Sequence, residues 1–332
     1  MNSHPDSDTS RIALTVGDPN GVGPEIALKA LAALTEAQRA RVTIFGPGDV
    51  LQVTSQALDL QEVLSSVDHT EVGGIASSAN IPGKIDPAAG RSAIESATAA
   101  IQACRLGGFT AVVAGPHHET AIAQAGIAFS GYPSLVATVC GGSQDSVFLM
   151  LVGAGLRIVH TTLHESVEVA LQRLRPELIV AATRAGVRAC HRLGIENPHV
   201  GIFGINPHAS EGGLFGQHDK NCTFPAAQTL RESGLHVSGP MGADMQLADH
   251  VTKPHDLYVA MFHDQGHIPI KLLAPQGATA LSIGADVLLA STGHGSAMDI
   301  AGTGQAKPLA LLRSLHMVMG IAPMTQHQTQ TS

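Results

Sequence analysis

Histidines recur directly after short apolar segments that are typical of buried β-strands. The four histidines and the segments that precede them are His118 after 110–114, His164 after 156–159, His208 after 199–205, and His263 after 257–262. Parallel strands place their carboxyl ends along one edge of a sheet, where α/β proteins bind their ligands. We therefore expect these four side chains along one carboxyl edge. Three of them, His164, His208 and His263, could hold a divalent ion such as Zn²⁺, because neutral imidazoles are common zinc ligands.

Two alternatives accompany this metal hypothesis. Gaps of 44 and 55 residues separate the three histidines, so no local ligand motif is present and each could be an ordinary loop or core residue. His160 also competes with His164 for the first ligand position. We favour His164 because it lies beyond the end of the predicted strand and can face a ligand.

Two glycine-rich segments could bring backbone close to a bound molecule. The segment 17–25 contains Gly21-Val22-Gly23 without a third glycine or a following lysine, so it is neither a Rossmann fingerprint nor a P-loop. It fits a tight strand-to-helix turn as well as a substrate loop. The segment 293–304 precedes the last predicted helix and fits either a nucleotide loop or a plain turn between domains.

Short apolar runs alternate with Ala- and Leu-rich stretches of helical period around these residues. The predicted strands are 11–16, 42–45, 110–114, 147–152, 156–159, 199–205, 257–262 and 280–283, and the predicted helices are 24–34, 90–106, 165–174, 176–193, 224–233 and 304–319. This alternation predicts an α/β fold with a largely parallel sheet. Pro24 and Glu25 mark the start of the first helix, because proline and acidic residues suit a first helical turn.

The composition narrows the class of protein. The chain has 332 residues, 44% hydrophobic and 14% charged, which predicts two domains or one large α/β body with a sizeable core. A net charge of −8 argues against a nucleic-acid partner. The polar first ten residues do not resemble a signal peptide, and no apolar run reaches the ~18 residues of a membrane span, so we expect a soluble cytoplasmic protein. We expect disorder in residues 1–10 and from about Thr325.

Four motifs, in order along the chain, resemble the 4-hydroxythreonine-4-phosphate dehydrogenase (PdxA) family. They are Gly17–Glu25, Asn206–Gly213, Met261–Gly266 and His294–Gly302. The resemblance implies two α/β/α domains like those of isocitrate and isopropylmalate dehydrogenases, with the active site in the cleft of a homodimer. It places the first domain at 11–129 plus 297–325 and the second at 130–296. It also implies a non-Rossmann NAD site and a divalent metal, which we expect to be Zn²⁺.

The resemblance assigns the metal ligands residue by residue, and the chemistry of the expected reaction suggests the other roles. The three metal histidines are His164, His208 and His263, although strict alignment puts Leu163 in the first position and His164 needs a one-residue slip. Lys271 is the expected acid or base; a salt bridge from it to a substrate carboxylate is the alternative. Asp244 and Asp264 are expected to orient a metal-bound histidine; for Asp264, a helix N-cap is the alternative. The expected cofactor residues are His294, Gly295, Ser296 and Asp299, and the expected substrate residues are His118 and Tyr132.

The departures from the family pattern concern its phosphate site. Five positions differ: Tyr132-Pro133 replaces a His-Thr pair, Glu119 a lysine, Ala280 an asparagine and Leu289 an arginine. Because a phosphate dianion needs guanidinium or amide partners, these losses predict a substrate without phosphate.

The segments that vary within the family resemble its terephthalate dihydrodiol dehydrogenase branch. They are 116–122, 126–135, 148–159, 163–166, 239–245 and 266–275. That branch implies NAD-dependent oxidative decarboxylation of 1,2-dihydroxy-3,5-cyclohexadiene-1,4-dicarboxylate to protocatechuate, a step of terephthalate degradation. Alternatives are the parent activity on a phosphorylated substrate, a dehydrogenase for another carboxylated diol, a zinc hydrolase without nucleotide, and a non-catalytic binding module.

Overall fold

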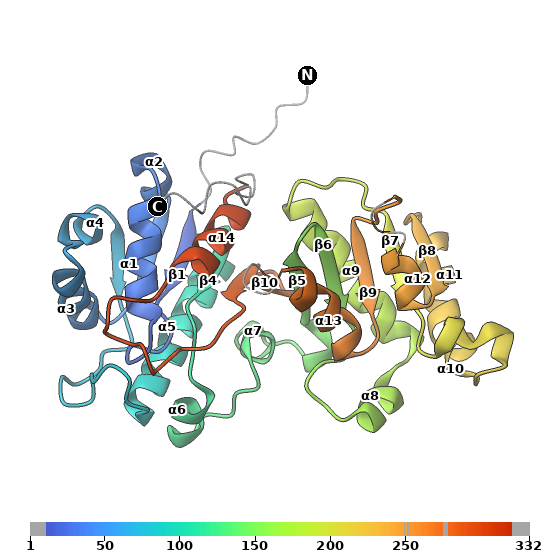
Figure 1. Ribbon diagram of the computed structural model, residues 1–332, viewed down its shortest axis with the longest axis horizontal. Helices are drawn as coiled ribbons and strands as arrows, with labels where there is room; N and C mark the ends of the chain where they lie inside the picture. Colours follow the sequence, from blue (N-terminus) through green and yellow to red (C-terminus); the bar gives the residue numbers. More distant parts are fainter. Residues whose placement is uncertain (1–10, 249, 251, 275–277, 321–332) are drawn as a thin grey trace. The chain divides into compact units, whose positions relative to one another are not determined.

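The computed structural model describes residues 11–248, 250, 252–274 and 278–320. Both regions of expected disorder and Pro275 of one family-like segment lie outside the described residues. The chain divides into two compact units, shown in Figure 1. Unit 1 comprises Met1–Cys140 and Asp286–Ser332, and unit 2 comprises Gly141–Ala285.

These unit boundaries differ from the predicted domain boundaries. Residues 130–140 and 286–296 were assigned to the second domain, but both segments belong to unit 1. The physical reason is pairing and packing: β11 (Leu289–Thr292) pairs with strand β4 of unit 1, and α7 (Tyr132–Cys140) packs against helix α5.

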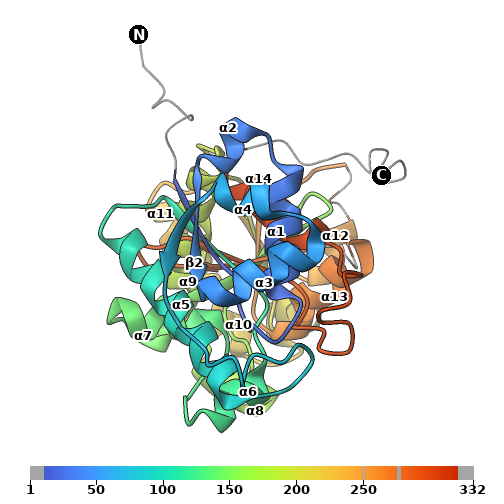
Figure 2. The same cartoon turned by 90° about the vertical axis from the view of Figure 1, so that its left-hand side faces the viewer.

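Unit 1 is built on a fully parallel sheet in the strand order β3-β2-β1-β4-β11. The strands besides β11 are β1 (Ile12–Thr15), β2 (Val42–Gly46), β3 (Asp68–Glu71) and β4 (Ala111–Ala114). The helices besides α7 are α1 (Gly23–Ala33), α2 (Glu36–Arg39), α3 (Gly48–Leu58), α4 (Gln61–Ser65), α5 (Pro87–Arg105), α6 (Glu119–Gln124) and α14 (Leu309–Val318). Helix α5 packs on β1, β2 and β4, while α14 packs on β4 and β11, and Figure 2 shows helices surrounding this sheet.

Unit 2 has the strand order β10-β5-β6-β9-β7-β8. Its strands are β5 (Phe148–Gly153), β6 (Leu156–His160), β7 (Val200–Phe203), β8 (Val237–Met241), β9 (Leu257–Ala260) and β10 (Thr279–Ile283). Its helices are α8 (Val167–Arg173), α9 (Pro176–Arg192), α10 (His218–Asn221), α11 (Thr223–Glu232), α12 (Ala243–Ala248) and α13 (His263–Leu273), with the short 3-10 segments η1 (Gln144–Ser146) and η2 (Pro207–Gly213). The four strands β6, β9, β7 and β8 are parallel, whereas β5 pairs antiparallel with both of its neighbours, β6 and β10.

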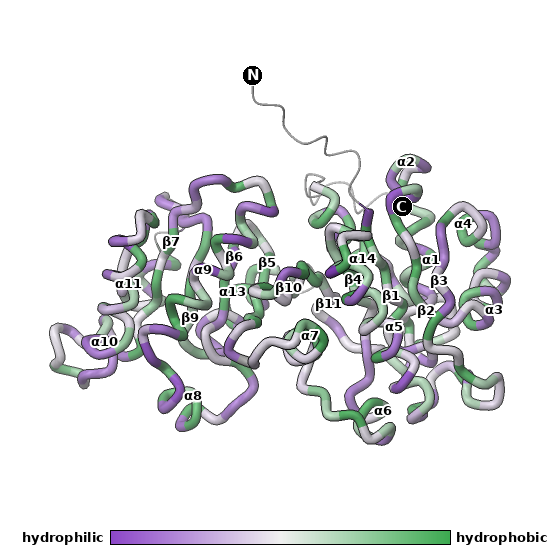
Figure 3. The backbone as a smooth tube through the Cα atoms, turned by 180° about the vertical axis from the view of Figure 1, so that it is seen from behind, coloured by the Kyte–Doolittle hydropathy of each residue, from purple (hydrophilic) through white to green (hydrophobic). Residues whose placement is uncertain are grey.

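The hydrophobic core of each unit follows its strands. Strands β1, β4 and β9 are completely buried, and Figure 3 shows hydrophobic residues concentrated in the strands of both units. Local signals agree with the helix starts: Pro87 and Pro176 open α5 and α9, and Asp86 caps α5 by accepting a hydrogen bond from Ala88 N (2.9 Å). Among the described helices, none is long and apolar enough to cross a membrane.

The predicted α/β class with a mostly parallel sheet is confirmed, but several elements were missed. Strand β3 is polar and exposed at the sheet edge, so it has no apolar pattern. Strands β8 and β11 were also missed, as were α3 and α13. Helix α13 contains Gly266 and Pro269, which both disfavour helix, so its segment reads as a loop in the sequence.

Candidate active site

The carboxyl edge of unit 2 gathers residues from four neighbouring parallel strands. His160 ends β6 and His164 follows it, His263 follows β9, His208 follows β7, and Asp244 follows β8. His118 follows β4, which belongs to unit 1. Three of the four histidines therefore lie at the carboxyl edge of unit 2. His118 does not, because β4 pairs with β1 and β11 of unit 1.

A cluster of four imidazoles lies at the ends of β6 and β9. His263 and His267, one turn apart on α13, stack with ring centroids 3.7 Å apart. His160 is completely buried, and its Nδ1 donates to the Leu149 carbonyl (3.2 Å). Its Nε2 therefore accepts from His267 Nδ1 (3.1 Å). The fourth ring, His164, is exposed and lies 5.5 Å from the His263 ring.

Burial controls the protonation of this cluster. Desolvation lowers the pKa of His160 to about 3 and that of His267 to about 4, so both rings are neutral at pH 7. Gly266 permits the arrangement, because any Cβ there would collide with the His160 ring. His267 was not predicted as a site residue. Its spacing of four from His263 was the available signal, but the segment had not been recognised as a helix.

The structure distinguishes the candidates for the first ligand position. Both nitrogens of His160 are already hydrogen-bonded, whereas His164 is exposed beside His263. Leu163, the strictly aligned residue, packs against the hydrophobic core of unit 2. His164 is thus the histidine that is available to a ligand.

The three predicted metal histidines are only partly assembled. His263 Nδ1 donates to Asp264 Oδ1 (2.7 Å), which leaves its Nε2 lone pair for a ligand. The His208 ring has Phe215 as its ring neighbour, with centroids 6.3 Å apart. Within the described residues, no three His, Cys, Asp or Glu side chains are grouped closely enough to hold a metal ion. The donor types and strand positions suit a divalent metal, but the side chains as they stand do not form its coordination sphere.

Lys271 and Asp244 are both exposed within unit 2. Lys271, the expected acid or base, lies on α13. It lies two turns beyond His263 on the same face of α13. Asp244 is exposed at the start of α12. A Cβ added at Gly242 would lie 2.6 Å from Asp244 Oδ1 and 4.0 Å from His208 N, so Asp244 lies near the turn that carries His208. In the part of the chain that is described, Asp264 rather than Asp244 contacts a candidate ligand.

At the carboxyl edge of unit 1, three loops are joined by backbone hydrogen bonds. Asp18 N donates to the Pro116 carbonyl (2.9 Å), and Val22 N donates to the Ser296 carbonyl (2.9 Å). Glu25 accepts hydrogen bonds from Gly304 N (3.2 Å) and from Ala306 N (2.8 Å). The buried glycine-rich segment 17–25 therefore links the loop after β4 to the glycine-rich segment 293–304.

The predicted cofactor residues occupy different environments within the segment 293–304. His294 is exposed, and its Nδ1 donates to the Gly295 carbonyl (2.9 Å). Ser296 is buried, and a Cβ on Gly21 would collide with it. Gly295 has open space around it, and Asp299 is exposed. The loop therefore presents His294, Gly295 and Asp299 outwards and uses Ser296 as its anchor.

The two predicted substrate residues are engaged in the fold. Tyr132 is 5% exposed, and its hydroxyl donates to the Gly115 carbonyl (2.7 Å). Its ring makes edge contacts with His117 and Phe129, at centroid distances of 4.9 and 6.0 Å. His118 Nδ1 accepts from Ala121 N (3.3 Å) and caps α6. The Tyr132 hydroxyl is thus committed to the backbone, and the role of Tyr132 in substrate binding stays a prediction.

Asp18 is a candidate that the sequence patterns did not single out. It is completely buried, and Oδ1 accepts from Asn20 N (2.9 Å), but Oδ2 has no hydrogen-bond partner among the described residues. Burial raises its pKa to about 6, with a smaller opposing effect from that hydrogen bond. An aspartate directly after a buried strand was the signal in the sequence. Its position beside Pro116 places it at the same edge as the predicted cofactor loop.

Replacing Asp18 by asparagine is expected to stabilise unit 1 at high pH. The folded-state pKa is raised above the ordinary 3.8, so the favourable contribution of Asp18 is complete below pH 3.8 and is lost as pH rises through about 6. The ionised group then costs up to about 3 kcal/mol, at about 1.4 kcal/mol per pKa unit. Asp18→Asn should raise the free energy of unfolding at pH 8 and change it little at pH 4. Equal effects at both pH values would contradict this.

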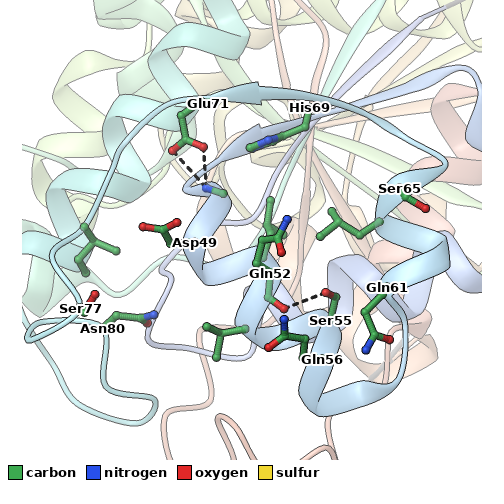
Figure 4. A pocket seen from close by; sticks show the side chains of 15 residues that line it. Asp49, Gln52, Ser55, Gln56, Gln61, Ser65, His69, Glu71, Ser77 and Asn80 are labelled. Atoms are coloured by element: carbon green, nitrogen blue, oxygen red, sulfur yellow. Dashed lines mark hydrogen bonds between the residues drawn. The ribbon is translucent and has the colours of Figure 1, made fainter.

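A separate pocket of about 880 Å³ lies in unit 1 at the carboxyl ends of β2 and β3 (Figure 4). Both Glu71 carboxylate oxygens accept from Gly48 N (3.1 and 2.9 Å), and Ser55 Oγ donates to the Gln52 carbonyl (2.9 Å). None of the predicted site residues lines this pocket. It is therefore distinct from both carboxyl-edge groups described above.

Comparison with known proteins decides the family. The model of the family described as pyridoxal phosphate biosynthetic protein PdxA matches residues 23–318. The chain belongs to the PdxA family. The 1,2-dihydroxy-3,5-cyclohexadiene-1,4-dicarboxylate dehydrogenase of a Comamonas species is 59% identical over 308 residues, covering 93% of this chain and 96% of that protein.

Solved structures support the same assignment. The terephthalate 1,2-cis-dihydrodiol dehydrogenase of Burkholderia xenovorans LB400 is 45% identical, with a TM-score of 0.73 and coverage of 94% and 98% of the two chains. A 4-hydroxythreonine-4-phosphate dehydrogenase of Burkholderia phymatum is 30% identical, with a TM-score of 0.81 and coverage of 95% and 99%. These PdxA-family relatives are named dehydrogenases, and the chain is an oxidoreductase of that type.

A more distant structure shows the fold alone. The β-decarboxylating dehydrogenase of Thermococcus kodakarensis is 18% identical, with a TM-score of 0.52 and coverage of 94% of this chain and 84% of the other. The predicted likeness to the isocitrate dehydrogenase group is consistent with this fold.

Proposed function

We propose that this PdxA-family member catalyses NAD-dependent oxidative decarboxylation of 1,2-dihydroxy-3,5-cyclohexadiene-1,4-dicarboxylate to protocatechuate in terephthalate degradation. The observation that carries the proposal is 59% identity across 93% of the chain to a dehydrogenase named for that diol. Position 289 adds physical support: the arginine of the family pattern is replaced by Leu289, which is completely buried in β11. An apolar strand residue provides no charge for a phosphate.

The proposed metal ligands are His164, His208 and His263, with Zn²⁺ as the proposed ion. A bound metal would lower the pKa of a coordinated substrate hydroxyl and stabilise developing negative charge, while the nicotinamide would accept hydride. Asp264 holds the His263 ring so that Nε2 is the free nitrogen. His160 and His267 remain neutral and pack beside this ring, so they add no positive charge near the proposed ion.

Lys271 is the proposed proton carrier. It lies on the same face of α13 as His263 and His267, and its positive charge is one of the influences that lower the pKa of His267. As an ammonium group Lys271 could donate a proton, and as the neutral amine it could accept one from the substrate hydroxyl. Tyr132 is proposed to act through the aromatic packing with His117 and Phe129 that supports the loop after β4, rather than through its hydroxyl.

The proposed nucleotide surface is the segment 293–304, with Asp299 near the adenosine. We expect Gly295→Leu to raise the KM for NAD⁺ at least about tenfold, with a much smaller effect on the KM for the diol, because a side chain there would occupy space open to the ligand. The fold should tolerate it, since no atom lies within 4 Å of an added Cβ. Gly74→Leu is the matched control, because Gly74 is equally open and has an ordinary φ. Equal changes in both KM values would place the cofactor elsewhere.

The proposed reaction is tested by its products. Purified protein, Zn²⁺ and NAD⁺ should convert the diol to equal amounts of NADH, CO₂ and protocatechuate. The second candidate is the parent activity on 4-hydroxythreonine 4-phosphate, which a 30% identical relative carries in its name. NADH formation with that compound alone would replace the proposal, and activity only with another carboxylated diol would narrow it to the family level. We also propose a homodimer, which light scattering of the purified protein would test.

A further inference from the structure

The segment that carries His208 has an unusual backbone. His208, Ala209, Ser210 and Glu211 have φ values of 52°, 49°, 70° and 42°, and Gly212 continues the run at 66°. Side-chain-bearing residues prefer the right-handed region by roughly 1–2 kcal/mol each. Four such residues in succession require specific support from the surrounding structure.

Asp219 supplies that support from α10. It is completely buried, and its Oδ1 accepts from Ile205 N (2.7 Å) and from Thr223 Oγ1 (2.8 Å). Its Oδ2 accepts from Asn206 N (2.9 Å) and from Ser210 Oγ (2.7 Å). Both carboxylate oxygens therefore accept hydrogen bonds, and three of the four donors belong to the segment 205–210.

The residues that donate three of these hydrogen bonds lie on both sides of His208 in the sequence. Two donors precede it and one follows it, so the carboxylate ties both ends of the turn that presents the imidazole. A further bond from Asn206 Nδ2 to Ser210 Oγ (3.1 Å) closes the same turn. His208 itself is exposed and makes no hydrogen bond with Asp219. Asp219 thus acts on the backbone of the turn, and the histidine side chain remains free for a ligand.

We propose that Asp219 is the positioning residue that fixes His208 at the carboxyl edge of unit 2. This inference rests on the proposed role of His208 as a metal ligand. A carboxylate suits the task because charge-assisted hydrogen bonds are about twice as strong as neutral ones. An amide of the same shape has only one acceptor oxygen, and its NH₂ group would face donors.

The experiment compares Asp219→Asn with wild type in the full-length protein, using Co²⁺ as the probe metal. We expect the affinity for Co²⁺ to fall about ten- to a hundredfold, the usual cost of losing a group that orients a ligand. Hydrogen exchange should accelerate in peptides that cover 205–213 and stay unchanged in peptides of β6 and β9. Ser210→Ala, which removes one of the four bonds, should give a smaller change in the same direction.

Glu25→Gln serves as the matched control for loss of a buried carboxylate. Glu25 is 3% exposed, but it belongs to unit 1, so its loss should leave Co²⁺ affinity unchanged. If Asp219→Asn fails to fold, the Ser210→Ala variant decides the inference by the same two measurements.

The outcomes separate the inference from the proposed function. Unchanged Co²⁺ affinity in both Asp219→Asn and Ser210→Ala, with wild type binding the ion, would overturn the positioning role. Faster exchange throughout unit 2 with unchanged affinity per folded molecule would reduce Asp219 to a general stabiliser and would overturn it too. A wild-type protein that binds no Co²⁺ would refute the metal function. In that case, unaltered exchange at 205–213 in Asp219→Asn would overturn the positioning role as well.

Discussion

His263→Ala is expected to lower turnover of the diol by at least about a hundredfold, the effect of losing one strong electrostatic contact to a developing charge. Its metal content should fall in parallel. The fold should survive, because the His263 side chain is 35% exposed and lies at the first turn of α13. Activity assays, metal analysis and a thermal unfolding curve of the same preparation would measure all three effects. His208→Ala should behave in the same way.

His236→Ala provides the matched control for this prediction. His236 is exposed and, like His263, stacks on another histidine; its partner is His199, with ring centroids 3.9 Å apart. It immediately precedes β8, at the amino end of the strand, opposite the candidate site. This variant should keep wild-type activity and metal content. Wild-type metal content and turnover in both His208→Ala and His263→Ala would remove the metal proposal.

The second large effect concerns substrate choice. The wild-type protein should turn over the dicarboxylated diol with a kcat/KM at least about a hundredfold above that for 4-hydroxythreonine 4-phosphate. A phosphate that lacks its arginine loses charge-assisted hydrogen bonds of about 1.5–3 kcal/mol each, and each corresponds to roughly a tenfold to hundredfold loss of affinity. Steady-state kinetics with both compounds would measure the ratio. Comparable kcat/KM values for the two compounds would refute the proposed substrate preference but would leave the metal and NAD proposals intact.

Leu289→Arg tests the physical basis of that preference. Leu289 pairs with Val112 inside the parallel sheet of unit 1 and has no exposed surface. An arginine there would bury an unmatched charge, which costs several kcal/mol. We expect a large drop in thermal stability and weaker turnover of the diol, whereas the volume-conserving Leu289→Met should cost less than about 1.5 kcal/mol. A stable Leu289→Arg protein that turns over the phosphorylated compound would show that this position faces the substrate.

Local patterns were sufficient to determine several features of this protein from its sequence. The α/β class follows from short apolar runs alternating with helical periods, and these periods are a property of neighbouring residues. The positions of His164, His208 and His263 at one carboxyl edge follow from the same patterns, because parallel strands share that edge. The family motifs are continuous segments, so the linear chain displays them directly. The leucine that replaces the family's arginine at position 289 is visible in the same way.

Other features depended on contacts between distant segments, and only the tertiary structure decided them. The sequence favours His164 over His160 only by its place beyond the predicted strand. The structure gives the reason for the difference, because His267, more than a hundred residues away, occupies a nitrogen of His160. The Tyr132 hydroxyl is committed because the loop after β4 places the Gly115 carbonyl beside it.

Burial is likewise a property of the assembled chain. Lys271 and Asp18 both carry ionisable side chains, yet Lys271 is exposed within its unit, while Asp18 is completely buried and its pKa is raised to about 6. Helix α13 forms although Gly266 and Pro269 disfavour it, because the glycine is what lets the helix pack against His160. Asp219 lies in a polar stretch without any motif. Its role exists only in the folded chain, which brings four hydrogen-bond donors to one carboxylate. Because the carboxylate is buried away from water, each of these hydrogen bonds is stronger than it would be in solvent.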